Sequence, residues 1–209
     1  MSGVLGVCFD FDGTLVDSNK VKRDFFIEFF STYCGGEEFI IDALNAPAVL
    51  DRYEIFEIFR RKFNLPKDQL REIRLDFNCQ LGRRVASAPL MKGVVQCLEH
   101  LRKNRCRIFI NSATPQNDLI KIVRSRSEFN DVEVVLGRPS SKSENLRTIV
   151  LASNFPADKI IVVGDGEDDR LGAVEVGCQF VPVFDYRGLP IFGIKPLQDL
   201  SLLVSMTDG

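Results

Sequence analysis

Five short apolar runs, separated by longer polar or helix-like segments, most constrain the fold of this 209-residue chain. The runs are rich in Val, Ile and Phe and are nearly continuous, which is typical of strands covered on both faces of a parallel sheet. They lie at residues 4–9, 107–110, 132–136, 160–163 and 180–184. Because proline cannot donate a hydrogen bond to a neighbouring strand, Pro182 predicts that the last run lies at an edge.

Helix-like segments separate the later runs. An amphipathic segment covers residues 92–104, and a second helix is expected at Thr114-Pro115, with Thr as the N-cap and Pro as the first helical residue. A third helix follows Ser141, with Glu144 at the capping-box spacing, and a fourth covers about residues 168–177. This alternation predicts an α/β fold, with a Rossmann-like parallel sheet core and helices on both faces.

Residues 16–88 break this alternation, because they contain no strong strand run. Apolar residues recur there at helical spacing, at 49, 53, 56, 59 and 63 and again at 70, 73, 77, 81 and 85. Nine of the seventeen phenylalanines lie in this segment (25, 26, 29, 30, 39, 56, 59, 63 and 77), and that many rings need a core of their own. We therefore expect a small α-helical domain at 16–88, inserted after the first strand of a core formed by 1–15 and 89–209.

Composition narrows the class of protein. The net charge is −2 and no basic tract stands out, so we expect no nucleic acid partner. No apolar run approaches the ~18 residues of a membrane span, and no signal peptide is visible, so we expect no membrane association and a cytoplasmic location. The six cysteines lack zinc-site spacing and are expected to be buried, reduced thiols. We expect a monomer or a homodimer.

Polar and acidic residues directly follow three of the strand runs. Asp10 and Asp12 follow the first run, residues 111–114 (NSAT) follow the second, and residues 165–169 (DGEDD) follow the run at 160–163. In open α/β sheets the carboxyl ends of the strands form the ligand site. The sequence therefore predicts a crevice lined by acids, hydroxyls and loop amides.

Clustered carboxylates repel one another and need a cation. Hard oxygen ligands, with no His or Cys nearby, favour Mg²⁺ over zinc, and Mg²⁺ held by carboxylates commonly works on phosphate groups. Ser112 with the amides that follow it, and Lys142 near a helix start, can bind phosphoryl oxygens. In this pattern Asp10 can serve as a metal ligand only or also as a nucleophile.

Four motifs resemble those of the haloacid dehalogenase-like (HAD) hydrolases. "DFDGTLVDS" resembles motif I, and "IFINSATP" is similar to motif II, a strand ending in Ser or Thr. Lys142 in "SSKSENL" resembles the lysine of motif III, and "IIVVGDGEDD" resembles motif IV, whose acids fall on Asp165 and Asp169. The motifs occur in the family's order across residues 1–15 and about 89–185.

The resemblance implies a Mg²⁺-dependent phosphatase that acts on a small phosphorylated metabolite. Asp10 would attack phosphorus and form an aspartyl-phosphate, and Asp12 would protonate the leaving oxygen and then deprotonate water. Mg²⁺ would be held by Asp10, the backbone carbonyl of Asp12, and Asp165. The insert would be a helical cap that closes over the site and excludes bulk water.

The resemblance also implies how the phosphate is bound. Ser112, backbone amides including that of Ala113, and Lys142 would stabilise the oxygens of the transferring group. Asp169 would hold a metal-bound water or orient Lys142. Family members often carry Lys-Pro at motif III, and here Arg138 precedes a proline; the position of Lys142, 23 residues before the motif IV aspartate, favours the lysine.

Two alternatives stay open from the sequence. A phosphosugar mutase resembling β-phosphoglucomutase would pass the phosphoryl group to a sugar in place of water. A receiver-like signalling module also combines acids, a hydroxyl residue and a lysine around Mg²⁺, although it would not need a large helical insert. The branch of the family with a helical cap, which includes phosphoglycolate phosphatases, is the leading hypothesis.

Overall fold

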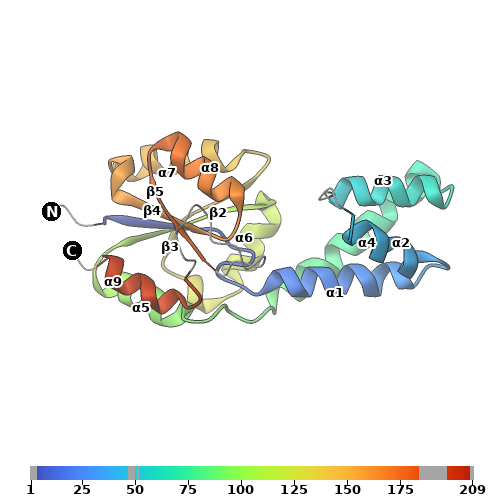
Figure 1. Ribbon diagram of the computed structural model, residues 1–209, viewed down its shortest axis with the longest axis horizontal. Helices are drawn as coiled ribbons and strands as arrows, with labels where there is room; N and C mark the ends of the chain where they lie inside the picture. Colours follow the sequence, from blue (N-terminus) through green and yellow to red (C-terminus); the bar gives the residue numbers. More distant parts are fainter. Residues whose placement is uncertain (1–3, 47–49, 51, 184–196, 208–209) are drawn as a thin grey trace. The chain divides into compact units, whose positions relative to one another are not determined.

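The computed structural model describes residues 4–46, 50, 52–183 and 197–207. The chain forms two compact units, one comprising Met1–Asp17 with Pro89–Gly209 and the other comprising Ser18–Ala88. The first unit is α/β and the second is helical (Figure 1). The predicted fold class is confirmed: a parallel sheet core with helices on both faces carries a small helical domain inserted after its first strand.

The α/β unit is built on a five-stranded parallel sheet with the order β3-β2-β1-β4-β5. The strands are β1 (Gly6–Phe9), β2 (Arg107–Pro115), β3 (Val132–Arg138), β4 (Ile160–Gly164) and β5 (Gln179–Pro182). Each coincides with a predicted run, although residue 184 of the last run lies outside the described residues. Pro182 ends β5, which is an edge strand of the described sheet, as its missing N–H predicts.

Helices cover both faces of this sheet. In Figure 1, α7 and α8 lie on one face, and α5 and α9 lie on the other. The bounds are α5 (Val94–Lys103), α6 (Gln116–Arg124), α7 (Lys142–Ser153), α8 (Glu167–Val176) and α9 (Val204–Thr207), with single 3₁₀ turns at Ser127–Phe129, Ala157–Lys159 and Leu200–Leu203. The predicted capping box is confirmed, because Ser141 and Glu144 exchange hydrogen bonds at the start of α7. Described helices with both the length and the hydropathy of a membrane span are absent.

The predicted start of α6 is wrong by one residue. Strand β2 continues through Thr114 to Pro115, which pairs with Arg138 of β3, and the helix begins at Gln116. Thr114 therefore does not cap the helix. Its hydroxyl donates instead to the carboxylate of Asp12, a partner from a distant segment that local sequence signals do not reveal.

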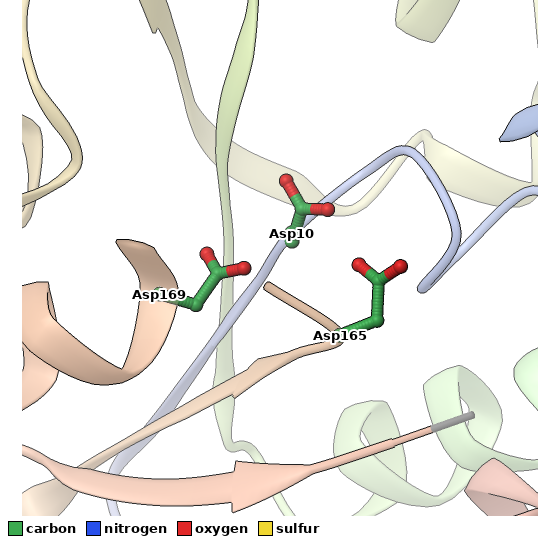
Figure 2. A group of neighbouring side chains, drawn as sticks. All are labelled: Asp10, Asp165 and Asp169. Atoms are coloured by element: carbon green, nitrogen blue, oxygen red, sulfur yellow. The ribbon is translucent and has the colours of Figure 1, made fainter. Parts of the chain in front are cut away.

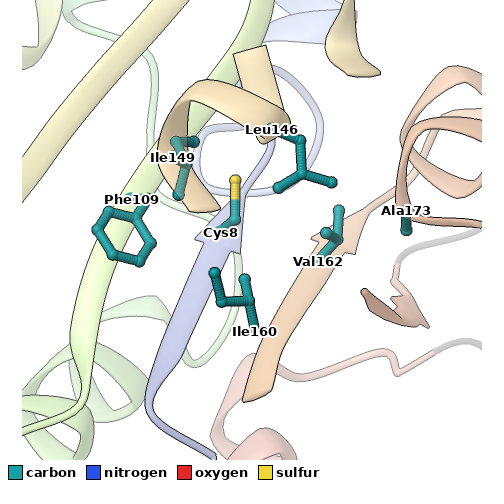
Figure 3. Packing of buried hydrophobic residues seen from close by; sticks show 7 residues of the cluster. All are labelled: Cys8, Phe109, Leu146, Ile149, Ile160, Val162 and Ala173. Carbon is teal, nitrogen blue, oxygen red and sulfur yellow. The ribbon is translucent and has the colours of Figure 1, made fainter. Parts of the chain in front are cut away.

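A hydrophobic cluster fills the space between the sheet and the helices α7 and α8 (Figure 3). Its buried members are Cys8, Phe109, Leu146, Ile149, Ile160, Val162 and Ala173. All six cysteines are free, and Cys8, Cys97 and Cys106 are buried as predicted. The prediction of burial is wrong for Cys34 and Cys79, which are exposed on the helical unit.

The helical unit leaves and rejoins the α/β unit through paired segments. Val16 forms an antiparallel bridge with Leu90, and the N–H of Asp17 donates to the carbonyl oxygen of Pro89 at 2.9 Å. The insertion therefore begins and ends at neighbouring points, so that β1 and β2 can pair directly despite the 71 residues of Ser18–Ala88 that separate them.

Four helices make up this unit: α1 (Ser18–Ser31), α2 (Gly36–Leu44), α3 (Arg52–Lys62) and α4 (Lys67–Ala86). The apolar positions predicted at 70, 73, 77, 81 and 85 are all buried in α4. In α3 the periodicity misplaces one residue, because Tyr53 is exposed and Ile55 is buried in its place. Position 49 of the predicted pattern lies outside the described residues.

Phe77 of α4 lies at the centre of the aromatic core that the phenylalanine count predicts. Its ring centroid lies 4.7–6.3 Å from those of Phe25, Phe26, Phe29, Phe30 and Phe56. Such ring pairs stabilise a core beyond the area that they bury.

We expect Phe77→Ala to lower the free energy of unfolding of the helical unit by about 3–5 kcal/mol, because it removes a fully buried ring and leaves a cavity. Urea titration followed by far-ultraviolet circular dichroism measures this loss. Leu75→Ala on the exposed face of the same helix is the matched control and should cost less than about 0.5 kcal/mol. Equal effects of the two variants would contradict the placement of Phe77 in the core.

Candidate active site

Three carboxylates converge at the carboxyl ends of two neighbouring strands. Asp10 follows β1, Asp165 follows β4, and Asp169 lies in the first turn of α8. One carboxylate oxygen of each lies within 4.8 Å of the others, and Figure 2 shows the three groups turned toward one space. Adjacent parallel strands bring their last residues to the same edge of a sheet, which explains the convergence of residues far apart in sequence.

Lys142 supplies the positive charge that this group of acids needs. It is the first residue of α7, and its Nζ lies 2.5 Å from Asp10 Oδ1 and 2.8 Å from Asp169 Oδ1. All three side chains are buried, with at most 9% of each exposed. A buried charge is costly unless it is paired, so the lysine and the two acids depend on one another.

The pKa values of the three acids are raised, mainly because the carboxylates are buried. Burial raises the pKa of Asp10, against the opposing effect of Lys142. Burial, together with repulsion from Asp10, raises the pKa of Asp165 to about 7 and raises that of Asp169 well above its ordinary value. Burial would lower the pKa of Lys142, but the carboxylates of Asp10 and Asp169 outweigh it and hold the pKa above its ordinary value.

This donor set fits a magnesium ion. The three acids offer hard carboxylate oxygens within the spacing that one cation can bridge, and no His or Cys belongs to the described group. A divalent cation would also favour the ionised forms of these carboxylates, against the effects of burial and mutual repulsion.

Asp12 lies apart from this group and has a different partner. The hydroxyl of Thr114 donates to Asp12 Oδ2 at 2.6 Å. The chain turns directly after Asp12 because Gly13 adopts a left-handed conformation with φ of 81°, and the N–H of Gly13 donates to the carbonyl oxygen of Val16. The hydroxyl of Thr114 and the turn at Gly13 therefore both help to fix the position of Asp12.

The other predicted residues lie at the end of β2 and the start of α7. Ser112 is buried, and its Oγ accepts a hydrogen bond from the N–H of Thr114, whereas Ala113 is exposed. Arg138 is exposed at the end of β3, so the lysine and not the arginine meets Asp10. Asp169 also accepts from the N–H of Gly166 at 3.3 Å, so it caps α8 while it binds Lys142.

The sequence-based predictions do not include Thr14 or Asn145 as site neighbours, and they place Thr114 in the crevice without its partner. Thr14 donates to Asp165 Oδ1 at 3.4 Å, Thr114 donates to Asp12, and Asn145 donates to Asn111 Oδ1 at 3.0 Å. Asn145 follows Lys142 by three residues, the spacing at which two residues share one face of a helix. That spacing is the one sequence signal that could have found it.

Comparisons with known proteins agree with this geometry. The model of the haloacid dehalogenase-like hydrolase family matches residues 4–177. No curated protein matches the sequence.

Several solved structures share the fold. A predicted phosphoglycolate phosphatase from Haemophilus somnus is 18% identical with a TM-score of 0.80, and all of each chain is covered. A HAD-superfamily hydrolase of subfamily IA from Geobacter sulfurreducens is 19% identical with a TM-score of 0.72, covering 99% of this chain and 98% of that one. CbbY from Rhodobacter sphaeroides, in complex with xylulose-(1,5)-bisphosphate, is 15% identical with a TM-score of 0.68, covering 99% of this chain and 100% of that one.

The raised pKa of Asp165 predicts that Mg²⁺ binding depends on pH. Because the cation binds the ionised carboxylate, protons compete with it below about pH 7, and the affinity should be roughly tenfold weaker at about pH 6 than at about pH 8. Calorimetric titration of Mg²⁺ at the two pH values measures the change. Asp165→Asn should abolish most of the binding, whereas Asp168→Asn, on an exposed neighbour, should alter it little. An affinity that does not change between the two pH values would contradict the assignment.

Proposed function

The chain belongs to the haloacid dehalogenase-like hydrolase family, and we propose that it is a Mg²⁺-dependent phosphatase that hydrolyses a small phosphorylated metabolite through an aspartyl-phosphate on Asp10. The observation that carries the proposal is the buried group formed by Asp10, Asp165 and Asp169 with Lys142 between two of them. This group combines a nucleophile, oxygen ligands for a cation and a fixed positive charge at one edge of the sheet.

In the first step a carboxylate oxygen of Asp10 attacks phosphorus. The new oxygen–phosphorus bond forms as the bond to the leaving oxygen breaks, and Asp12 in its acid form gives that oxygen its proton. The hydroxyl of Thr114 holds the side chain of Asp12, so the acid is fixed near the nucleophile.

In the second step water attacks the phosphorus of the aspartyl-phosphate. Asp12, now ionised, takes a proton from that water, and the bond between Asp10 and phosphorus breaks to release inorganic phosphate. One residue thus acts first as acid and then as base, which requires its carboxyl group to stay in place between the two steps.

The remaining residues supply charge and hydrogen bonds. Mg²⁺ would be held by Asp10, the backbone carbonyl of Asp12, and Asp165, and when bound it would screen the charge between nucleophile and phosphate. Ser112, the amide of Ala113 and Lys142 stabilise the oxygens of the transferring group. Asp169 orients Lys142 through their 2.8 Å ion pair.

The substrate class is supported by names among the similar structures, a predicted phosphoglycolate phosphatase and CbbY in complex with a sugar bisphosphate. Membership of a hydrolase family removes the receiver-like alternative. A phosphosugar mutase would share the first step and differ only in its acceptor. Cytoplasmic location, lack of a nucleic acid partner, and a monomeric or homodimeric state stay predictions.

We expect the wild-type protein to release many equivalents of phosphate from an aryl phosphate in the presence of Mg²⁺. Removal of the metal with EDTA, or the substitution Asp10→Asn, should abolish turnover, because each removes a required participant in bond formation. Phosphate release and covalent labelling are measured together. A protein that is labelled once and never turns over would contradict hydrolysis, whereas transfer of the label to an added sugar phosphate would favour the mutase.

Asp12→Asn should lower kcat by about 10²- to 10⁴-fold, because the amide cannot donate or accept the proton in either step. The stability of the variant, measured by thermal unfolding, is the control for its fold. A loss of only a few-fold in a well-folded variant would assign Asp12 to the turn before Gly13 and not to catalysis.

A further inference from the structure

Two buried asparagines, Asn111 in the middle of β2 and Asn145 in the first turns of α7, lie close to the lysine of the candidate site. Only 3% and 5% of their surfaces are exposed. Neither has an assigned function in the mechanism above. A buried side-chain amide that loses its partners costs about 1–3 kcal/mol, so two such amides beside the active site demand an explanation.

Asn111 contacts both ends of Lys142. Its backbone carbonyl oxygen accepts a hydrogen bond from Lys142 Nζ at 2.7 Å, and its side-chain Nδ2 donates to the carbonyl oxygen of Lys142 at 2.9 Å. The backbone and the ammonium group of the lysine are therefore tied to the same residue of β2. Because β2 pairs with β1, this attachment fixes the position of Lys142 relative to β1, the strand that Asp10 directly follows.

Asn145 determines which way the amide of Asn111 faces. Its Nδ2 donates to Asn111 Oδ1 at 3.0 Å and to the carbonyl oxygen of Gly137 at 3.3 Å. With its oxygen engaged by a donor, the amide of Asn111 must present its nitrogen to the carbonyl oxygen of Lys142. The opposite orientation would set two acceptors against each other.

Gly137 allows β3 to contribute a hydrogen-bond acceptor for Asn145. A Cβ at this position would lie 2.3 Å from the backbone oxygen of Thr114, so only glycine permits β3 to approach the end of β2 this closely. The carbonyl oxygen of Gly137 thereby reaches Asn145. The hydrogen bonds then run from β3 through Asn145 and Asn111 to Lys142.

We infer that Asn111 and Asn145 are positioning residues that fix the ammonium group of Lys142 between Asp10 and Asp169, in the place that transition-state stabilisation requires. The inference rests on the phosphatase function proposed above. A lysine ammonium on four flexible carbons is a mobile point charge, and its contribution to a transition state depends on where it is held. The asparagines reduce that mobility from both ends of the residue.

The test uses Asn111→Ala, Asn145→Ala and the double variant in the full chain. We expect each single variant to lower kcat for an aryl phosphate by roughly tenfold to a hundredfold, with KM changed less than about threefold, because misplacement of a charged group acts mainly on the transition state. The affinity for vanadate, which mimics the five-coordinate phosphorus, should fall with kcat, whereas the affinity for Mg²⁺ should stay unchanged.

The double variant shows whether Asn111 and Asn145 act through one another or support the structure independently. If Asn145 acts through Asn111, the double variant should lose no more activity than Asn111→Ala alone, whereas independent effects would multiply. Ser153→Ala is the matched control, because Ser153 is a buried polar residue at the other end of α7 whose hydroxyl donates to the carbonyl oxygen of Val150 and accepts from the N–H of Phe155. It should lower stability while leaving kcat as it is. Asn145→Ser, a smaller change that keeps a donor, replaces Asn145→Ala if the latter does not fold.

Lys142→Met distinguishes failure of this inference from failure of the proposed function. If Lys142→Met loses activity while the asparagine variants keep the kcat and the vanadate affinity of the wild type, the positioning role is overturned and the phosphatase mechanism stands. If Lys142→Met itself keeps full activity, the lysine has no part in the transition state and the inference is overturned with that part of the mechanism. Losses that multiply in the double variant would also overturn it.

Discussion

The ion pairs of Lys142 with Asp10 and Asp169 are the interactions on which the rest of this site depends. A buried carboxylate at the end of a central strand is costly, and the ammonium group offsets that cost only if α7 begins close to the sheet. The capping box of Ser141 and Glu144 fixes the first turn of α7, and Gly172 of α8 lies against that turn, where a Cβ would be in ordinary contact with Lys142. Helix capping, helix packing and active-site charge are thus parts of one arrangement.

The order of the strands explains why residues so distant in sequence meet. From β1 the chain adds β2 and β3 on one side and then crosses to add β4 and β5 on the other. The loops after β1 and β4 therefore lie next to each other at the point where the direction of winding reverses, and such points form the ligand crevices of open α/β sheets. The helical insertion fits this scheme because its two ends pair at Val16 and Leu90 and leave the pairing of β1 with β2 intact.

The sequence predicts those features that are encoded locally. Apolar runs identify the strands, the capping box identifies the start of α7, and helical spacing identifies the buried face of α4. The predictions fail where a residue bonds to a segment that is distant in sequence. Thr114 has the local signature of an N-cap, but its hydroxyl donates to Asp12 instead. In the sequence only the spacing of Asn145 distinguishes it from other helical residues, and its hydrogen bond to Asn111 is seen only in the structure. Family motifs name the charged groups of the site and Ser112, but the hydrogen bonds of Thr114 and Asn145 become visible only in the structure.

Asp10 and Asp12 show how neighbours in sequence can acquire different chemistry. Residues two apart in an extended chain point to the same side, so their carboxylates would repel, and Asp12 does contribute to the raised pKa of Asp10. The two carboxylates differ in their surroundings. Asp10 is buried against the ammonium group of Lys142, whereas Asp12 is partly exposed and accepts a hydrogen bond from the hydroxyl of Thr114. The ion pair with Lys142 opposes the effect of burial on the pKa of Asp10 and so favours the ionised form that a nucleophile needs. The carboxyl group of Asp12, held by the hydroxyl of Thr114, is the group that exchanges a proton in the proposed mechanism.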